Sequence, residues 1–198
     1  MKTILAFDVA QILNPAQIEK FGAAMGAVGI YLRPDRSTPD MAKRIADSGM
    51  ALWSVYEKSY PTFAAYFTAT QAKADATNAV SQALHLKQPF ATQIFFAVDY
   101  DASSADILGP ISEYFAVVHT EVRKAGYLSS VYGSGAVIEH LYSAGTAHSG
   151  WLAQSKRWRG YSPRCAGLSI IQGIETNMNG VDIDLDTVID ATALWRPN

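Results

Sequence analysis

The chain has 198 residues, 49% of them hydrophobic, which is enough to bury a full core and indicates a single domain over residues 1–198. Its 16 basic and 18 acidic residues are spread along the chain, without the basic tract expected of a nucleic-acid-binding protein. The single Cys165 excludes an internal disulfide, and the four scattered histidines lack the spacing of metal ligands. We therefore expect no cofactor, no resident metal and no nucleic-acid partner.

The first segment, "MKTILAFDVAQ", has one lysine and about six apolar residues before Asp8, which is short of a signal-peptide core. No apolar run approaches the roughly 20 residues that span a bilayer. We therefore expect a monomer that is synthesised in the cytoplasm without a signal peptide and does not insert into a membrane.

Apolar, strand-like segments alternate with segments of helical spacing up to residue 144. Asn14 followed by Pro15 is typical of a helix start, and Gly49 of a helix end. Such alternation predicts a parallel sheet with right-handed crossovers. The predicted strands are 4–10, 27–33, 50–57, 92–101 and 127–133, and the predicted helices are 14–25, 38–49, 63–86, 104–125 and 134–144.

The rhythm changes in the last third, where 150–155, 166–173 and 180–185 are strand-like and leave no room for helices between them. Eight strands that close on themselves predict an α/β fold, namely a shortened TIM-like (β/α) barrel with five β/α units followed by three strands with few or no helices. An open, doubly wound sheet is the alternative.

Acidic residues stand at the ends of several predicted strands. Within "IFFAVDYD" (94–101), Asp99 and Asp101 share a face with the small Ala97, which in a barrel is the better candidate for the lumen. The carboxyl ends of barrel strands form the mouth, where barrel enzymes carry their catalytic residues. The acids concerned are Asp8, Glu57, Asp99, Asp101 and the pair Asp182 and Asp184.

If these acids share one cleft, mutual repulsion raises some of their pKa values and creates an acid/base pair near neutral pH. Glycoside hydrolysis needs such a pair, with one protonated and one ionised carboxyl. A single acid has a simpler explanation, and Asp101 and Asp186 are ordinary examples of turn or cap residues. A site for a hard cation is a further alternative, although the spacing matches no calcium loop.

Aromatic residues gather at the same predicted strand ends, and their rings can stack on sugars. We interpret Trp53 as a core residue, and Tyr132 and Trp151 as the better candidates for sugar subsites. The other aromatic side chains at this end are Tyr31, Tyr56, Tyr60 and Tyr100.

Eight short motifs occur in a characteristic order: "FDVAQ", "GIYLR", "GMALWSVYE", "IFFAVDYD", "VYGSG", "WLAQS", "IIQG" and "VDIDLD". Their order resembles a family of glycoside-hydrolase-like barrels of unknown function, found in phage lysis proteins and bacterial secreted proteins. This family is distantly related to the glycoside hydrolase family 25 lysozymes. The resemblance implies a shortened barrel, with five α/β units followed by bare strands.

The resemblance also assigns roles to individual positions. Asp8 matches the acid that ends the first strand of those lysozymes, and Asp99 the first acid of their D-x-E motif. Asp182 matches an acid of the last strand, and Gln172 the polar residue that ends strand seven.

One position departs from the lysozyme pattern, because Asp101 stands where those enzymes have their catalytic glutamate. A shorter side chain draws the carboxyl back, and placement errors near an ångström can lower a rate about a hundredfold. Glu57 matches the "YE" of the closer family and is our candidate for the missing general acid.

These observations predict a lysozyme-like peptidoglycan glycosidase that cuts the β-1,4 bond after N-acetylmuramic acid. The predicted context is a phage or prophage endolysin, or a delivered lytic effector, which reaches the wall after release by a holin or a secretion machine. Two alternatives stay open, a barrel that binds cell-wall glycans without cutting them and a hydrolase of another polysaccharide.

Overall fold

The computed structural model of the protein describes residues 3–58 and 60–197, which form a closed eight-stranded barrel. The strands follow one another around the barrel in chain order, and β8 closes it by pairing with β1. The strands are β1 (Ile4–Val9), β2 (Ala27–Tyr31), β3 (Ala51–Tyr56), β4 (Gln93–Ala97), β5 (Leu128–Gly133), β6 (Gly150–Leu152), β7 (Leu168–Met178) and β8 (Val181–Val188).

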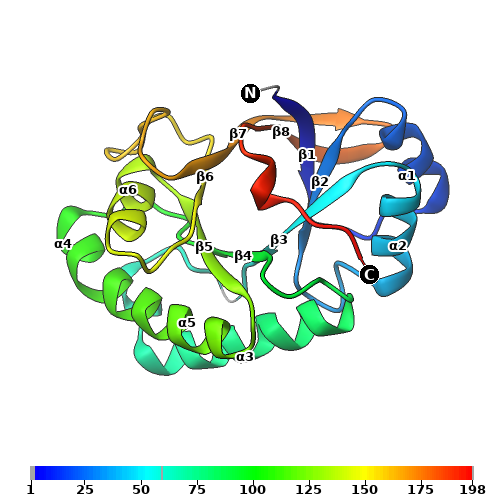
Figure 1. Cartoon of the computed structure of the whole chain (residues 1–198). Coiled ribbons are helices and arrows are strands. Elements are labelled where there is room, and N and C mark those ends of the chain that lie inside the picture. Colours follow the sequence, from blue (N-terminus) through cyan, green and yellow to red (C-terminus); the bar gives the residue numbers. More distant parts are fainter. Residues whose placement is uncertain (1–2, 59, 198) are drawn as a thin grey trace.

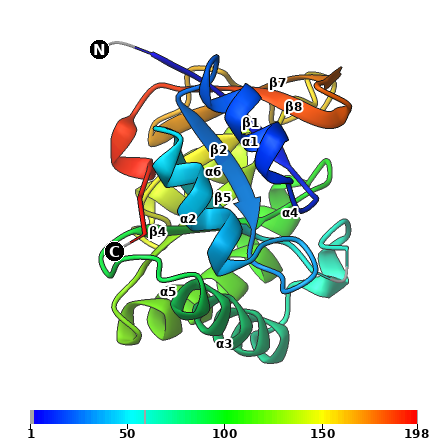
Figure 2. The same ribbon diagram turned by 90° about the vertical axis from the view of Figure 1, so that its right-hand side faces the viewer.

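Helices cover the outside of the barrel beside the first six strands, whereas no helix lies between β6 and β7 or between β7 and β8 in the chain (Figure 1). In Figures 1 and 2, α3 and α5 pack side by side. The helical segments are α1 (Pro15–Gly22), α2 (Pro39–Asp47), η1 (Ala64–Tyr66), α3 (Ala69–His85), α4 (Ser104–Asp106), η2 (Ile107–Ile111), α5 (Ser112–Lys124), α6 (Gly135–Ser143) and η3 (Ala191–Ala193). The predicted shortened TIM-like barrel is confirmed, and the open sheet is wrong.

The helix starts follow from local sequence. Asn14 and Gln17 form a capping box before α1, with Pro15 at the first helical position, as predicted. Thr38 and Ser134 cap α2 and α6 with their hydroxyls.

Two predicted helices are interrupted. The segment 63–86 divides into η1 and α3 because Thr68 accepts a hydrogen bond from the amide of Gln71 and begins a new helix there. The segment 104–125 contains the π-turn η2, where Gly109 leaves the helical region and Pro110 has no amide hydrogen to donate.

The last strand runs opposite to the other seven, which differs from the parallel sheet that the alternating pattern predicts. β7 and β8 form a hairpin through Asn179 and Gly180, whose φ angles of 56° and 74° are those of a tight two-residue turn. β8 is therefore antiparallel to both β7 and β1, and its first residues lie at the same end as the last residues of the other strands.

The interior of the barrel is filled with apolar side chains rather than open. Trp53 and Trp151 meet edge to face with ring centroids 5.6 Å apart, and Phe95 lies 6.3 Å from Trp151. Gly29 makes room for this packing, because a Cβ atom there would lie 2.5 Å from the Trp53 ring. The predicted core position of Trp53, which is 0% exposed, is confirmed.

The C-terminal segment closes one end of the barrel. Trp195 pairs with Leu52 through two backbone hydrogen bonds, and its indole donates to the Ser54 hydroxyl at 3.0 Å. We call this end the floor and the opposite end the mouth. Figure 2 shows the red C-terminal segment on the left, at the floor, and the orange β7–β8 hairpin reaching to the right, toward the mouth. Within residues 3–58 and 60–197, no helix combines the length and apolar character needed to cross a membrane.

Candidate active site

Five carboxyl groups meet at the mouth, brought there by strands that are distant in the sequence. We call them the carboxyl cluster: Asp8 of β1, Glu57 after β3, Asp99 after β4, and Asp184 and Asp186 of β8. Tyr31 reports on their proximity, because burial and then the negative charges of Asp8, Glu57, Asp184 and Asp99 raise the pKa of its phenol. The structure therefore brings together four of the acids named from strand ends, Asp8, Glu57, Asp99 and Asp184, together with one further acid of β8, Asp186.

Gln172 links two carboxyl groups of the cluster, Asp8 and Asp184. Its Nε2 donates to Oδ2 of Asp8 at 3.1 Å and to Oδ2 of Asp184 at 3.0 Å. Its Oε1 accepts from the Tyr132 hydroxyl at 2.8 Å and from the Gln154 amide at 3.2 Å. This set of donors and acceptors fixes the orientation of the Gln172 amide and holds two carboxyls beside each other.

Asp8 and Asp184 lie opposite each other in the β1–β8 ladder. Burial raises the pKa of Asp8 to about 7, with the charge of Asp184 as the next cause, while the hydrogen bond from Gln172 acts in the opposite direction. Burial also raises the pKa of Asp184, followed by the charge of Glu175.

Asp186 is the deepest acid of the cluster and is 2% exposed. Its Oδ1 accepts from the Trp151 indole at 2.8 Å, whereas Oδ2 has no hydrogen-bond donor among the residues that the structure describes. Burial, and then the charge of Asp8, raise its pKa well above the usual range. A proton on Oδ2 resolves this arrangement, since protonated Asp186 can donate to Asp8.

Glu57 and Asp99 form the other side of the cluster. Burial, and then the charge of Asp99, raise the pKa of Glu57 to about 7, while the charge of Arg33 acts in the opposite direction. Burial also raises the pKa of Asp99. A carboxyl with a pKa near 7 beside a second carboxyl can act as a general acid at neutral pH.

Asp101 lies outside the cluster, contrary to our expectation of a shared cleft. Its carboxylate accepts from the backbone amide of Arg159 at 2.8 Å and from Nε of the same residue at 2.9 Å. The β6–β7 loop thus supplies a cation that neutralises Asp101. β4 ends at Ala97, so the alternation of side chains along the strand does not extend to Asp101 and could not reveal this partner.

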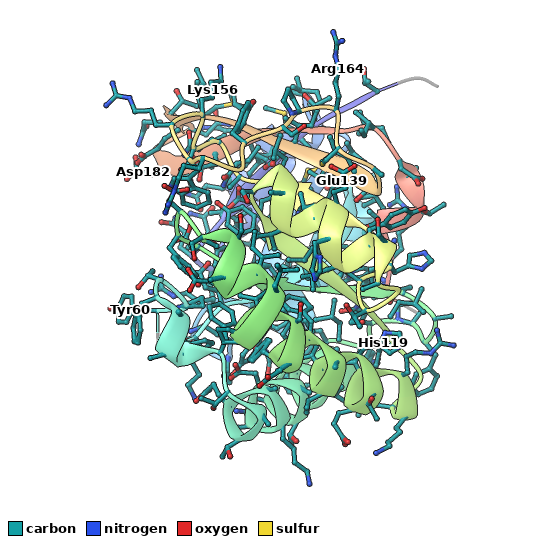
Figure 3. The ribbon with its side chains drawn as sticks, turned by 90° about the vertical axis from the view of Figure 1, so that its left-hand side faces the viewer. Tyr60, His119, Glu139, Lys156, Arg164 and Asp182 are labelled. Carbon is teal, nitrogen blue, oxygen red and sulfur yellow. The ribbon has the colours of Figure 1, made fainter. Side chains whose placement is uncertain are left out.

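Asp182 also lies outside the cluster. It is exposed on the β7–β8 hairpin and accepts from the Asn177 side-chain amide at 2.7 Å. Figure 3 shows it at the same edge of the molecule as Tyr60, with His119 near the opposite edge. Because β8 is antiparallel, its carboxyl-terminal part runs into the barrel, and Asp184 and Asp186 occupy the cluster instead.

Three of the predicted subsite aromatics are placed differently. Tyr56 faces the helices, where its hydroxyl accepts from Asn78 of α3 at 3.4 Å, and Tyr100 packs on Phe67 with ring centroids 6.0 Å apart. Trp151 is 1% exposed inside the barrel and cannot present its ring to a sugar. Tyr31, Tyr132 and Gln172 do lie at the mouth, beside the carboxyl cluster.

Asp186 is the functional candidate that sequence reasoning missed, since its position before "TV" suggested a turn or cap. The signal that could have found it is the dipeptide Asn179–Gly180 ahead of a strongly alternating segment, which indicates a hairpin and reverses the last strand. Asp182, Asp184 and Asp186 then form a row on one face, from exposed to buried.

The structure has a cavity beside the carboxyl cluster and a larger one at the opposite end of the barrel. One of about 420 Å³ is at the mouth and is lined by Arg33, Arg36, Glu57, Lys58 and Tyr60. A larger one of about 640 Å³ is at the floor, away from the carboxyl cluster. In the described part of the chain, no group of three or more His, Cys, Asp or Glu residues is arranged to hold a metal ion.

Comparison with known proteins identifies several with the same architecture. The Tat-secreted protein Rv2525c of Mycobacterium tuberculosis, solved with HEPES, superposes with a TM-score of 0.79 at 16% identity, over 98% of both chains. The modular autolysin LytC of Streptococcus pneumoniae superposes with a TM-score of 0.61 at 14% identity, over 93% of this chain and 46% of LytC.

Sequence comparison adds an uncharacterised protein of Bacillus subtilis (strain 168), YbfG. It is 33% identical over 81 residues, which are 40% of this chain and only 11% of YbfG. The model of the Rv2525c-like, glycoside hydrolase-like domain family matches residues 20–188, which include four of the five carboxyls of the cluster. The chain therefore belongs to the Rv2525c-like family of glycoside hydrolase-like domains.

Proposed function

We propose that the protein is a peptidoglycan glycosidase of the muramidase type, which hydrolyses the β-1,4 bond after N-acetylmuramic acid. The observation that carries this proposal is the carboxyl cluster, in which Glu57 has a pKa of about 7 and Asp99 lies close enough to contribute to that shift. Glycosidases need one carboxyl that delivers a proton and a second that is ionised.

Glu57 is the proposed general acid and delivers its proton to the glycosidic oxygen as the bond breaks. Ionised Asp99 or Asp8 then stabilises the positive charge that develops on the sugar ring, or activates a water molecule. A carboxylate can do either. The hydrogen bond from Gln172 keeps the Asp8 carboxyl in place. A proton on Asp186, whose pKa is raised, limits the negative charge next to Asp8.

Peptidoglycan is the proposed substrate because of what the similar proteins are. LytC is an autolysin, and another of its structures holds a synthetic peptidoglycan ligand. At 14% identity, the similarity to LytC establishes only the fold, and peptidoglycan as the substrate of this protein is our proposal. We further propose that the protein acts on the cell wall as a phage-type or delivered lytic protein, after release across the membrane.

The test is digestion of purified peptidoglycan, followed by mass spectrometry of the soluble fragments. We expect new reducing ends that carry N-acetylmuramic acid. Reducing ends of N-acetylglucosamine would reassign the bond that is cut, and fragments from a different polysaccharide alone would reassign the substrate.

A barrel that binds glycans without cutting them is the second candidate. The observation in its favour is Asp101, which stands where family 25 lysozymes have a catalytic glutamate and is bound to Arg159 instead. Retention on insoluble peptidoglycan, with no reducing ends released over a long incubation, would favour this candidate over the muramidase.

A further inference from the structure

Three cations surround the mouth cavity that Glu57 helps to line. Arg33 and Arg36 come from the loop after β2, and Lys58 follows Glu57 directly. The remaining lining residue is Tyr60, which is 79% exposed. The mouth therefore has a basic cavity directly beside the acidic carboxyl cluster.

The two guanidinium groups are held in place by a single carboxylate. Asp35 accepts from Nε of Arg33 at 3.1 Å and from Nη2 at 2.9 Å, and its Oδ2 lies 3.4 Å from Nε of Arg36. Arg36 also donates through Nη1 to the carbonyl of Ala10, in the loop after β1. These contacts order both side chains before any ligand binds, which reduces the entropy lost on binding.

The charges in this cavity do not cancel. One carboxylate faces two guanidinium groups, and no salt-bridge partner of Lys58 is found within residues 3–58 and 60–197. Both guanidinium groups keep N–H donors that Asp35 and Ala10 do not use. The cavity therefore offers ordered donors and a net positive charge to an anion.

The position of the cavity limits which anion fits. A polyanion such as a nucleic acid or a charged membrane surface would meet the carboxyl cluster as well as the three cations. A neutral sugar ring with one acidic substituent avoids that repulsion, since the ring lies over the cluster and the substituent reaches the cavity. Glu57 borders both, so a sugar whose glycosidic oxygen meets Glu57 has its substituents next to the cations.

We propose that Arg33, Arg36 and Lys58 form a subsite for a carboxylate carried by the substrate sugar. This inference rests on the proposed glycosidase function and specifies its substrate class as an acidic glycan. In peptidoglycan, that carboxylate belongs either to the lactyl group of a sugar without peptide or to the stem peptide.

The subsite also couples substrate binding to the general acid. The charge of Arg33 lowers the pKa of Glu57, and a bound carboxylate offsets that charge. Glu57 then keeps its proton to a higher pH when an acidic substrate is in place. A carboxylate substrate should move the alkaline limb of the kcat profile upward, relative to the same glycan with its carboxyl groups reduced to alcohols.

The experiment measures binding calorimetrically on the full chain carrying Glu57→Gln, so that no glycan is cut. Its ligands are glycan strands freed of peptide, the same strands with reduced carboxyl groups, and strands that retain the stem peptide. We expect at least about tenfold weaker binding once the carboxylates are reduced, as for the loss of a charge-assisted hydrogen bond. A preference for peptide-free strands assigns the lactyl group, and a preference confined to peptide-bearing strands assigns the stem peptide.

Lys58→Gln, added to Glu57→Gln, should remove most of this preference. Lys43→Gln is the matched control, since Lys43 is an exposed cation on α2 that pairs with Asp47. Equal binding of intact and reduced strands, no binding of either, or a preference that Lys58→Gln leaves unchanged would overturn the subsite. Failure of the proposed function looks different, because the wild-type protein would then show the preference and release no reducing ends.

Discussion

Each end of the barrel has a buried glutamine that bridges neighbouring strands, but the two have different partners. At the floor, Oε1 of Gln93 accepts from the hydroxyls of Ser130 at 2.7 Å and Ser149 at 2.5 Å, and its Nε2 donates to the Thr192 carbonyl at 3.1 Å. At the mouth, Nε2 of Gln172 donates to two carboxyl groups.

These different partners suit Gln93 to stabilising the fold and Gln172 to positioning reactive groups. The polar partners of Gln93 are neutral and fully bonded, so they can be buried at little cost. Of the carboxyls near Gln172, Asp8 and Asp186 have raised pKa values because of burial first and the charge of a neighbouring carboxyl second, and both causes destabilise the ionised forms. TIM-type barrels show this division generally, with stability at the floor and catalysis at the mouth.

The largest expected effect comes from removing the general acid. Glu57→Gln should lower the rate of reducing-end release from peptidoglycan by about 10²- to 10⁴-fold, because the proton on Glu57 is lost while its shape is kept. The melting temperature should not fall. Glu19→Gln, an exposed change on α1, is the control and should leave the rate unaltered. A Glu57→Gln protein with near wild-type activity would exclude Glu57 as the acid.

Substituting the two glutamines separates the roles of the floor and the mouth. Gln93→Leu should lower the free energy of unfolding by about 2–3 kcal/mol, since two hydroxyls and a carbonyl lose their partner. Its rate per folded molecule should stay at the wild-type value. Denaturant unfolding and reducing-end assays on the same samples measure both quantities.

Gln172→Leu should instead reduce the rate and move the acidic limb of its pH profile upward. The reason is that the hydrogen bond from Gln172 lowers the pKa of Asp8, so its loss raises that pKa. If Gln93→Leu slowed the reaction and Gln172→Leu did not, the division between floor and mouth would be wrong.

A smaller effect is expected from Asp8→Asn, which imitates the protonated acid. The pKa of Asp8 is raised from 3.8 to about 7, so its favourable contribution to stability is complete below about pH 4 and is lost as the pH rises through 7. Asp8→Asn should therefore raise the melting temperature at pH 8, by roughly 2–4 °C per kcal/mol, and change it little at pH 4. Asp182→Asn, on the exposed hairpin, is the matched control. Equal shifts at both pH values would show that Asp8 is not crowded.

The smallest effect belongs to Asp101→Asn. Its ion pair with Arg159 is largely exposed, and such pairs contribute about 0–1 kcal/mol. We expect a similar loss of stability and little change in rate, because the carboxyl cluster remains whole. A loss of rate as large as that of Glu57→Gln would assign a catalytic role to Asp101.

The barrel was predictable from sequence because helices and strands alternate with clear caps, and because three strand-like segments lie too close together for helices. Asp8, Glu57 and Asp99 were predictable for the same reason, since the ends of parallel strands meet at one edge.

The remaining part of the site depends on contacts that sequence spacing does not encode. The direction of β8 decides whether Asp182 or Asp186 is buried, and that direction depends on a two-residue turn. Asp101 does not join the carboxyl cluster because it pairs with Arg159, which lies 58 residues further along the chain. Sequence spacing also did not reveal which side of the strand an aromatic ring occupies. Tyr56 faces the helices, and Trp151 is buried inside the barrel.

At neutral pH, the mouth of the barrel should hold a carboxyl group that keeps its proton, namely Glu57. The most direct test follows the side-chain carboxyl carbon of Glu57 by NMR during a pH titration, in protein labelled at glutamate and with Glu57→Gln for assignment. We predict a midpoint near pH 7, and a lower one in Asp99→Asn, because a negative neighbour is removed. A midpoint near 4.5, the ordinary value for glutamate, would contradict the account.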